Sequence, residues 1–199
     1  EPFDETTYSW YFHKIGGGRC PIINITGGTE LIGCLLAPTP LTPLKSCTVG
    51  QFGGLGMAVD VFNEEGRPIR NEIGYLVCKK PFPSMTKSFV GDDTRYLETY
   101  FSRWPGVWYH GDFVKIDEDG YWFIYGRSDD VIKVAGRRIG PGEIEESFLK
   151  HLSVKEAAAI GAPDEIKGER LVCFVVLKDD SGVSENELKE HCGNLLGKT

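Results

Sequence analysis

Three short segments of this 199-residue chain carry side chains that could bind a phosphorylated ligand. The first runs from Thr26 to Glu30 (TGGTE) and follows a short apolar run. Glycines such as Gly28 let a backbone approach a ligand closely, the Thr29 hydroxyl can bond a phosphoryl oxygen, and Glu30 can hold Mg²⁺. A glycine-rich turn with a solvated glutamate is the alternative interpretation, and this segment alone does not decide between the two.

The second segment contains Asp112, which follows a glycine and lies between aromatic residues, and the third, residues 126–139, contains Arg127 and Arg138. A carboxylate is costly to bury unless its acceptors are used, and the vicinal hydroxyls of a ribose offer two donors. Arg127 can flank that diol, and Arg138 can meet a phosphate. The structural alternatives are an aspartate that caps a turn, an Arg127 paired with the aspartates that follow it, and an exposed hairpin arginine at position 138.

Residues 109–145 form the stretch around which these side chains are organised. Apolar residues up to Ile116, an acidic turn and the aromatic run 121–125 predict a β-hairpin, because Gly120 supplies positive φ without steric strain. The aromatic run ends abruptly in the polar segment 126–130, after which the apolar pattern resumes and Pro141 opens a helix. A polar joint this short predicts a hinge between two separately folded domains.

The remaining pattern predicts a mixed α+β fold. The apolar run 20–25 (CPIINI) is typical of a buried α/β strand, and open α/β sheets place ligands at the carboxyl ends of such strands. Short strands at 57–62 and 73–78 predict a small barrel or sandwich, followed by a helix at 92–102. Beyond residue 130 we expect a compact α+β unit with helices beginning near Pro141 and Ser184 and with strands at 157–160 and 171–177.

The composition excludes several classes of protein. Hydrophobic residues make up 41% of the chain, enough to bury a core, and the net charge of −7 argues against nucleic-acid partners or anionic membranes. No apolar run approaches the roughly 20 residues that span a bilayer, and no signal peptide opens the sequence. None of the six cysteines forms a C-x-x-C pair, so we expect free thiols in a reducing cytoplasm rather than a zinc site.

Taken together, these segments resemble the adenylate-forming acyl-CoA synthetases, with the acetyl-CoA synthetase branch nearest. The resemblance covers the whole chain in order and rests on five segments: Thr29–Glu30, Tyr109–Asp112 (YHGD), Gly126–Lys133 (GRSDDVIK), Gly136–Ile139 (GRRI) and Glu143–Glu145 (EIE). It implies that ATP and a carboxylic acid give an acyl-adenylate and pyrophosphate, after which the thiol of CoA displaces AMP. The implied cofactors are ATP/AMP, CoA and Mg²⁺, and the sequence leaves the oligomeric state open.

The resemblance also implies roles for single residues and domains. The nucleotide would be bound by Gly28, Thr29, Asp112, Arg127 and Arg138, and Mg²⁺ by Glu30. Asp129 matches the hinge about which the C-terminal domain rotates between the two half-reactions, and rotation would open the CoA channel beside Gly136. Residues 1–34 would be a remnant of the large domain's α/β sheet, 35–128 its barrel-like β subdomain, and 129–199 the mobile C-terminal α+β domain, truncated at its end.

Three departures from the family pattern matter. The glycine-, serine- and threonine-rich phosphate loop would lie upstream of Glu1, and the catalytic lysine of adenylation beyond Thr199, so we expect a C-terminal portion that is inactive alone. Acetate-specific members close the acyl pocket with a tryptophan where this chain has Gly27. We therefore expect an acid larger than acetate, each buried methylene being worth about 0.8 kcal/mol. The alternatives are an adenylating enzyme with a non-CoA acceptor and a non-catalytic nucleotide-binding module.

Overall fold

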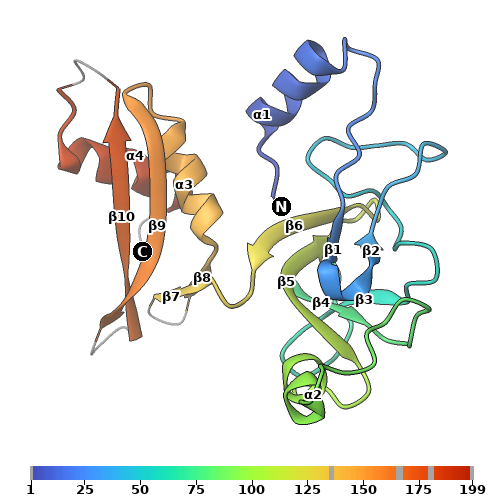
Figure 1. The fold of residues 1–199 in the computed structure, drawn as a ribbon. Coiled ribbons are helices and arrows are strands. Elements are labelled where there is room, and N and C mark those ends of the chain that lie inside the picture. The colour runs from blue at the N-terminus through green and yellow to red at the C-terminus, as the bar shows by residue number, and fades with distance from the viewer. Residues whose placement is uncertain (1, 135–136, 165–167, 179–181, 198–199) are drawn as a thin grey trace. The chain divides into compact units, whose positions relative to one another are not determined.

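A computed structural model describes residues 2–134, 137–164, 168–178 and 182–197. The chain divides into two compact units, Glu1–Ser128 and Asp129–Thr199, and each is described by itself (Figure 1). The first unit begins with helix α1 (Glu5–Trp10) and the π-helical turn η1 (Tyr11–Ile15). Helix α1 starts where it does because the Asp4 side chain accepts the Thr7 N–H at 2.8 Å, an N-terminal cap.

A four-stranded antiparallel sheet organises the first unit. In the order β3–β4–β5–β6 its strands are β3 (Val59–Phe62), β4 (Gly74–Cys78), β5 (Trp108–Ile116) and β6 (Trp122–Arg127) (Figure 1). Strands β5 and β6 form the predicted hairpin, with Gly120 at φ +83° in its turn. All neighbouring strands in this sheet pair antiparallel, and its two outer strands are β3 and β6.

The β6 edge of this sheet is paired with the loop at residues 49–50. The Val49 N–H donates to the Trp122 carbonyl, and the Trp122 N–H donates to the Gly50 carbonyl, both at 2.9 Å. These bonds satisfy backbone groups that an edge strand would otherwise expose. The proline- and threonine-rich segment 37–50, which forms no strand of its own, therefore covers this edge of the sheet.

Strand β1 (Thr26–Gly28) pairs antiparallel with β2 (Gly33–Leu36), and the 3₁₀ turn η2 (Thr29–Leu31) joins them. The buried strand predicted at residues 20–25 is wrong: that segment forms no strand, and Ile23 and Ile25 are 46% and 47% exposed. A buried parallel strand requires strands on both edges, and no strand in the described part of the chain pairs with this segment.

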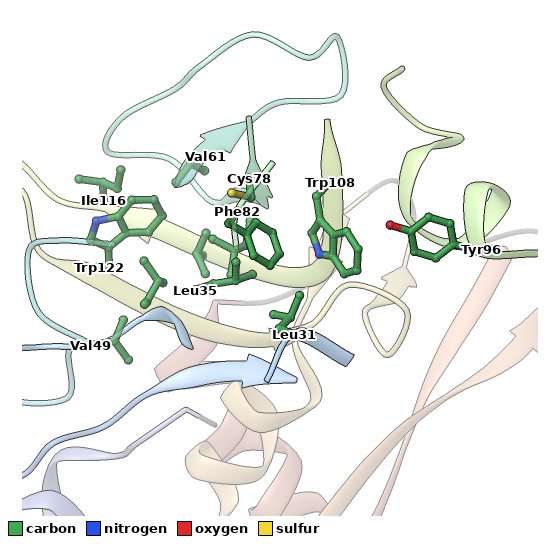
Figure 2. Close-up of a cluster of buried hydrophobic side chains, with 13 residues drawn as sticks. Leu31, Leu35, Val49, Val61, Cys78, Phe82, Tyr96, Trp108, Ile116 and Trp122 are labelled. Atoms are coloured by element: carbon green, nitrogen blue, oxygen red, sulfur yellow. The ribbon is translucent and has the colours of Figure 1, made fainter. Parts of the chain in front are cut away.

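The core of the first unit lies against the sheet and centres on Trp108, which is fully buried (Figure 2). Helix α2 (Asp93–Phe101) begins at Asp92, whose side chain accepts the Arg95 N–H at 2.9 Å. Its Tyr100 ring stacks on the Trp108 indole with centroids 3.9 Å apart and planes 12° apart. The buried cluster comprises Leu31, Leu35, Leu36, Val49, Val61, Leu76, Cys78, Phe82, Tyr96, Trp108, Val114, Ile116 and Trp122.

The second unit contains a separate four-stranded sheet and two helices. The sheet order is β8–β7–β10–β9, with β7 (Ile132–Val134), β8 (Arg137–Ile139), β9 (Val154–Asp164) and β10 (Gly168–Leu177). Helix α3 (Pro141–Leu149) begins at the predicted proline, and α4 (Glu185–Leu196) is capped by Ser184, whose hydroxyl accepts the Glu187 N–H at 3.3 Å. The core of this unit consists of Ile132, Ile139, Ile144, Phe148, Val154, Ala159 and Leu188.

The predicted mixed fold class is confirmed, because both units combine antiparallel sheet with helices. Within the described ranges, every helix is too short or too polar to cross a bilayer.

Candidate functional site

Asp112 lies in the middle of β5, directly opposite Arg127 on β6. Its side chain is 11% exposed. One carboxylate oxygen, Oδ2, accepts the Thr26 hydroxyl at 3.0 Å and lies 3.6 Å from His110 Nε2. The other oxygen, Oδ1, lies 3.4 Å from Arg127 Nη1. The carboxylate is therefore nearly buried and is contacted from β1, β5 and β6.

The guanidinium of Arg127 rests on the backbone of β5. Its Nη1 donates to the His110 carbonyl at 3.0 Å, and an added Cβ at Gly111 would lie 2.5 Å from Nη2. Gly111 also has φ +88°, a conformation that residues with a side chain rarely adopt. Glycine at position 111 therefore gives both the backbone conformation and the space for the arginine beside Asp112.

The turn at Gly28–Glu30 faces the same region. An added Cβ at Gly28 would lie 2.3 Å from Glu30 Oε2, so the glycine leaves room for the Glu30 carboxylate to fold back over the backbone. Burial raises the pKa of the Tyr100 hydroxyl, and the charge of Glu30 raises it further. The negative charge of Glu30 also favours the protonated form of His110 and so raises its pKa.

His110 is a buried titratable group beside the Asp112 carboxylate. Burial lowers the pKa of its imidazole below 6.5, although Asp112, Glu30 and the Gly27 carbonyl oppose this effect. The ring is therefore neutral at pH 7. Its Nδ1 is buried without a hydrogen-bond partner.

The last residue of the first unit is tied to the same strand. Ser128 donates from its backbone N–H to the Gly111 carbonyl at 2.7 Å, and its hydroxyl donates to that carbonyl at 3.0 Å. The hydroxyl also contacts the Tyr109 hydroxyl. Ser128, which follows Arg127 in the polar joint 126–130, is thus held on β5.

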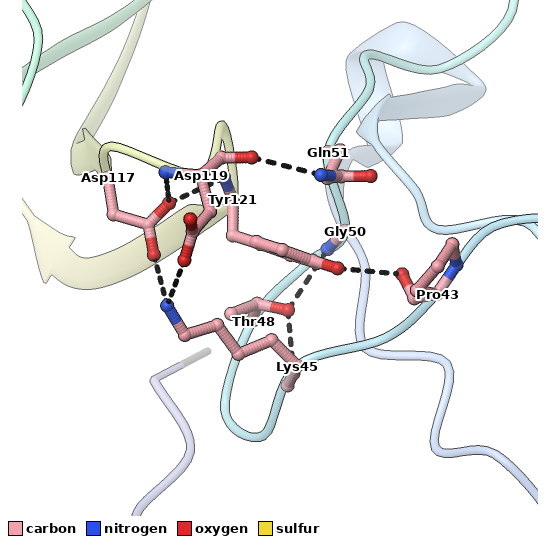
Figure 3. Close-up of polar contacts among 8 residues, drawn as sticks. All are labelled: Pro43, Lys45, Thr48, Gly50, Gln51, Asp117, Asp119 and Tyr121. Carbon is pink, nitrogen blue, oxygen red and sulfur yellow. Dashed lines mark hydrogen bonds and ion pairs between the residues drawn. The ribbon is translucent and has the colours of Figure 1, made fainter.

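The turn at the other end of the hairpin is fixed by the loop before it in sequence (Figure 3). Lys45 Nζ pairs with Asp117 Oδ2 at 2.5 Å and Asp119 Oδ2 at 3.3 Å. Gln51 Nε2 donates to the Asp119 carbonyl at 3.0 Å, and the Tyr121 hydroxyl reaches the Pro43 carbonyl at 3.5 Å. Both ends of the strand pair that carries Asp112 are therefore restrained.

The structure brings some of the predicted site residues together and leaves others apart. The 26–30 turn, Asp112 and Arg127 meet in the first unit through the Thr26 hydrogen bond. Asp129 is exposed and opens the second unit, and Arg138 lies in β8 of that unit. Gly136 lies outside the described residues.

Gly27 has a structural role that the sequence did not reveal. An added Cβ there would lie 2.2 Å from the Gly33 carbonyl oxygen, across the β1–β2 pair. Glycine at this position therefore permits close strand pairing, and its missing side chain is not in itself a sign of an open pocket.

The residues around Glu30 suit a nucleotide-bound magnesium ion rather than a site built by the protein alone. Among the described residues, no three His, Cys, Asp or Glu side chains are grouped so that they could hold a metal. Mg²⁺ commonly takes one or two carboxylates and completes its shell with water and substrate phosphates. A single carboxylate beside a glycine-rich turn fits that pattern.

Sequence reasoning missed Thr26 and His110 as partners of Asp112. His110 had a usable signal, because residues two apart in a strand face the same side and its ring would then lie beside the carboxylate. The sequence carried no such signal for Thr26, because its hydrogen bond to Asp112 joins residues 86 positions apart.

Residues 143–199 match the family profile of the AMP-binding enzyme C-terminal domain. With the site described above and the relatives below, the chain belongs to the adenylate-forming (AMP-dependent) acyl-CoA synthetase family. Within that family it is 44% identical over 181 residues to an acetyl-coenzyme A synthetase of Chlorobaculum tepidum, covering 90% of this chain and 27% of that protein. It is 41% identical over 210 residues to the acetyl-coenzyme A synthetase of Methanothrix thermoacetophila, covering 99% and 31%.

Two solved structures that are similar to this chain indicate the same family. An acetoacetyl-CoA synthetase from Streptomyces lividans matches with a TM-score of 0.79 and 26% identity, over 97% of this chain and 30% of that chain. An anthranilate CoA ligase in complex with anthranoyl-AMP matches with a TM-score of 0.76 and 25% identity, over 98% and 37%. The chain spans less than a third of the length of both curated relatives named above.

Proposed function

We propose that this chain is part of an AMP-forming acyl-CoA synthetase and binds the nucleotide of its acyl-adenylate. In the whole enzyme, a carboxylic acid and ATP would give acyl-adenylate and pyrophosphate, and the CoA thiol would then release AMP. The observation that carries the proposal is the nearly buried Asp112 carboxylate, which lies opposite Arg127 and beside the 26–30 turn. The family membership of the chain and the named activities of its relatives support it.

Each residue of this region would have one task. The Asp112 carboxylate would accept both ribose hydroxyls, since a carboxylate has about four lone-pair positions. Arg127 would neutralise its charge, Thr29 and Gly28 would contact the α-phosphate, and Glu30 would ligate Mg²⁺. The metal, when bound, would offset phosphate charge.

The second unit would be the mobile C-terminal domain, with residues 1–34 and 35–128 belonging to the large domain. The division of the chain between Ser128 and Asp129 supports a pivot at Asp129. In the rotating domain, Arg138 would approach the phosphate, and the CoA channel would pass Gly136. A few residues at a domain boundary are enough to absorb such a rotation.

For the acid we propose acetate or one similarly small, following the acetyl-coenzyme A synthetases among the relatives. The expectation of a larger acid rested on Gly27 and finds no support in these names. The close approach of Gly33 to Gly27 also removes the argument that a missing side chain leaves a pocket. Free cysteines throughout the chain support a cytoplasmic location.

A chimera tests this function. This chain would replace the matching segment of the Chlorobaculum tepidum enzyme, and acid- and CoA-dependent AMP release would be measured with acetate, propionate and butyrate. We expect activity that is greatest with acetate and falls roughly 10- to 100-fold in Asp112→Asn, since one hydrogen bond to a charged group contributes about 1.5–3 kcal/mol.

Other outcomes of the chimera experiment would point elsewhere. AMP release without CoA dependence would favour an adenylating enzyme with another acceptor, and an Asp112→Asn chimera as active as its parent would refute the site. The isolated chain is expected to bind AMP yet make no acyl-adenylate. Pyrophosphate exchange by the pure chain would contradict that expectation.

A further inference from the structure

The two oxygens of the Asp112 carboxylate have unequal surroundings. Oδ2 is contacted by the Thr26 hydroxyl at 3.0 Å and His110 Nε2 at 3.6 Å, from two different strands. Oδ1 is contacted by Arg127 Nη1 at 3.4 Å, longer than the 2.7–2.9 Å or so typical of a charge-assisted hydrogen bond. The carboxylate is therefore held mainly through Oδ2, and Oδ1 keeps more of its acceptor capacity.

His110 is unusual for a group so deeply buried. Its side chain is 4% exposed, and its Nδ1 has no hydrogen-bond partner. Buried polar side chains are nearly always hydrogen-bonded, so an imidazole kept in this position needs an explanation. Its Nε2 faces the Asp112 carboxylate, and that contact supplies one.

We propose that Thr26 and His110 are positioning residues, which hold Oδ2 of Asp112 so that the carboxylate is oriented to accept the two ribose hydroxyls. This inference rests on the proposed nucleotide site. It requires a neutral His110, because an imidazolium would form a charge-assisted bond to Oδ2 and compete with the sugar. Nucleoside binding is then linked to the protonation of one buried histidine.

The charged groups around His110 come from every neighbouring element. Asp112 on the same strand and Glu30 on η2 favour its protonation, whereas burial and Arg127 on β6 oppose it. The charges of Glu30 and Arg127 also act on the pKa of Tyr100 on α2, which Glu30 raises and Arg127 lowers. Because burial outweighs the two carboxylates, the pKa of His110 lies below its ordinary value and the ring is neutral near pH 7.

The first test needs no ligand. The chain has four histidines, and the imidazole signals of the full chain can be followed by NMR against pH, with His110→Gln assigning the signal of interest. Asp112→Asn should lower the pKa of His110, because it removes the nearest negative charge. Thr26→Val should raise that pKa, because Oδ2 loses the hydrogen bond from the Thr26 hydroxyl and its negative charge then acts more strongly on His110, whereas Thr26→Ser should leave it near the wild-type value. An unchanged His110 titration in both Asp112→Asn and Thr26→Val would overturn the proposal.

The second test uses adenosine, whose lack of a phosphate removes the ligand's own titration near neutral pH. We expect wild-type affinity to fall about 2- to 10-fold between about pH 7.5 and about pH 5.5, the range that one hydrogen bond contributes. Bound adenosine should lower the pKa of His110 by linkage. His110→Gln should flatten the pH profile, and Thr26→Val should weaken binding where Thr26→Ser does not.

The outcomes separate the inference from the function on which it rests. A wild-type chain that binds adenosine and 2′-deoxyadenosine equally would refute the ribose role of Asp112, while the ligand-free titration would still decide the contact with His110. Preferential binding of adenosine with a pH profile identical in wild type and His110→Gln would leave the ribose site standing and refute the positioning role. Unfolding curves of each variant show whether a loss of binding comes from a loss of fold.

Discussion

Two glycines of the β5–β6 hairpin allow the position of Arg127 to be tested separately from backbone strain. Gly111 and Gly126 have φ of +88° and +102°. An added Cβ at Gly111 would lie 2.5 Å from Arg127 Nη2, whereas one at Gly126 would meet nothing within 4 Å apart from its two chain neighbours. Gly111→Ala and Gly126→Ala therefore impose a similar backbone strain. The clash with Nη2 arises at Gly111, whereas consecutive side chains on a strand such as β6 point to opposite faces, so a methyl group at position 126 should point away from the Arg127 side chain.

The two effects differ in magnitude and in what they change. A side chain forced to positive φ costs about 1–2 kcal/mol, a modest part of the 5–15 kcal/mol or so that stabilises a typical domain. The clash at Gly111 adds little, because the guanidinium ends a long side chain that is 47% exposed and can swing away. Swinging away breaks its 3.0 Å bond to the His110 carbonyl and its 3.4 Å contact with Asp112, so we expect AMP to bind about 10-fold more weakly.

Stability and binding would be measured on the same variants. Tryptophan fluorescence in urea reports on the first unit alone, because all four tryptophans lie there: Trp10, Trp104, Trp108 and Trp122. Calorimetry gives the AMP affinity, with Arg127→Ala as the matched loss of the guanidinium. We expect both alanine variants to be destabilised alike, and Gly111→Ala to bind as weakly as Arg127→Ala. Equal AMP affinities in Gly111→Ala and Gly126→Ala would refute this reasoning.

Two further predictions follow from titratable groups whose surroundings shift their pKa. Burial alone would raise the pKa of Asp60, but Lys79 at 2.7 Å, a backbone N–H and Arg70 at 2.9 Å hold it below 3.8. A lowered carboxyl pKa gives stability above the unfolded pKa that is lost as pH falls through the folded one, so Asp60→Asn should be less stable at neutral pH and lose less stability below about pH 4. Urea midpoints across pH check this, and parallel losses in both proteins would contradict it. Burial raises the pKa of the Cys173 thiol to about 11, so iodoacetamide near pH 8 should label exposed Cys20 well before Cys173, as read by peptide mass spectrometry; equal rates would disprove it.

Elements with a local signal could be predicted from the sequence. The turn at Gly120, the proline that opens α3 and the serine that caps α4 each determine structure within a few residues of themselves. The structure of residues 20–25 could not be predicted in this way, because an apolar stretch becomes a buried strand only when other strands pair with it. The structure gives this segment no such neighbour in its described ranges, and Ile23 and Ile25 remain half-exposed.

In the candidate site, too, contacts set by a local sequence pattern could be predicted, whereas contacts between distant segments could not. Asp112 and Arg127 could be expected to meet, because the predicted hairpin turn brings their strands together and the observed register sets them directly opposite. The approach of Thr26 depends on how β1 and β2 pack against the sheet, which no local pattern specifies. The close approach of Gly33 to Gly27 could not be predicted either, because it depends on the pairing of β1 with β2.

The candidate site and the polar joint are both attached to the β5–β6 strand pair, so a movement of the joint would affect the site. Ser128 is bonded through its backbone and its hydroxyl to the Gly111 carbonyl, and the Arg127 guanidinium lies over Gly111. Asp129 follows directly, so a rotation there that pulled Ser128 from Gly111 would also loosen the backbone that supports Arg127 beside Asp112. In the proposed rotation, the affinity for the nucleotide and the position of the C-terminal domain would be coupled directly through Ser128 and Arg127, which are adjacent in sequence. Ser128→Ala, which removes the hydroxyl bond but keeps the backbone bond, should therefore weaken AMP binding less than Arg127→Ala does; the reverse order by calorimetry would place the support of the site elsewhere.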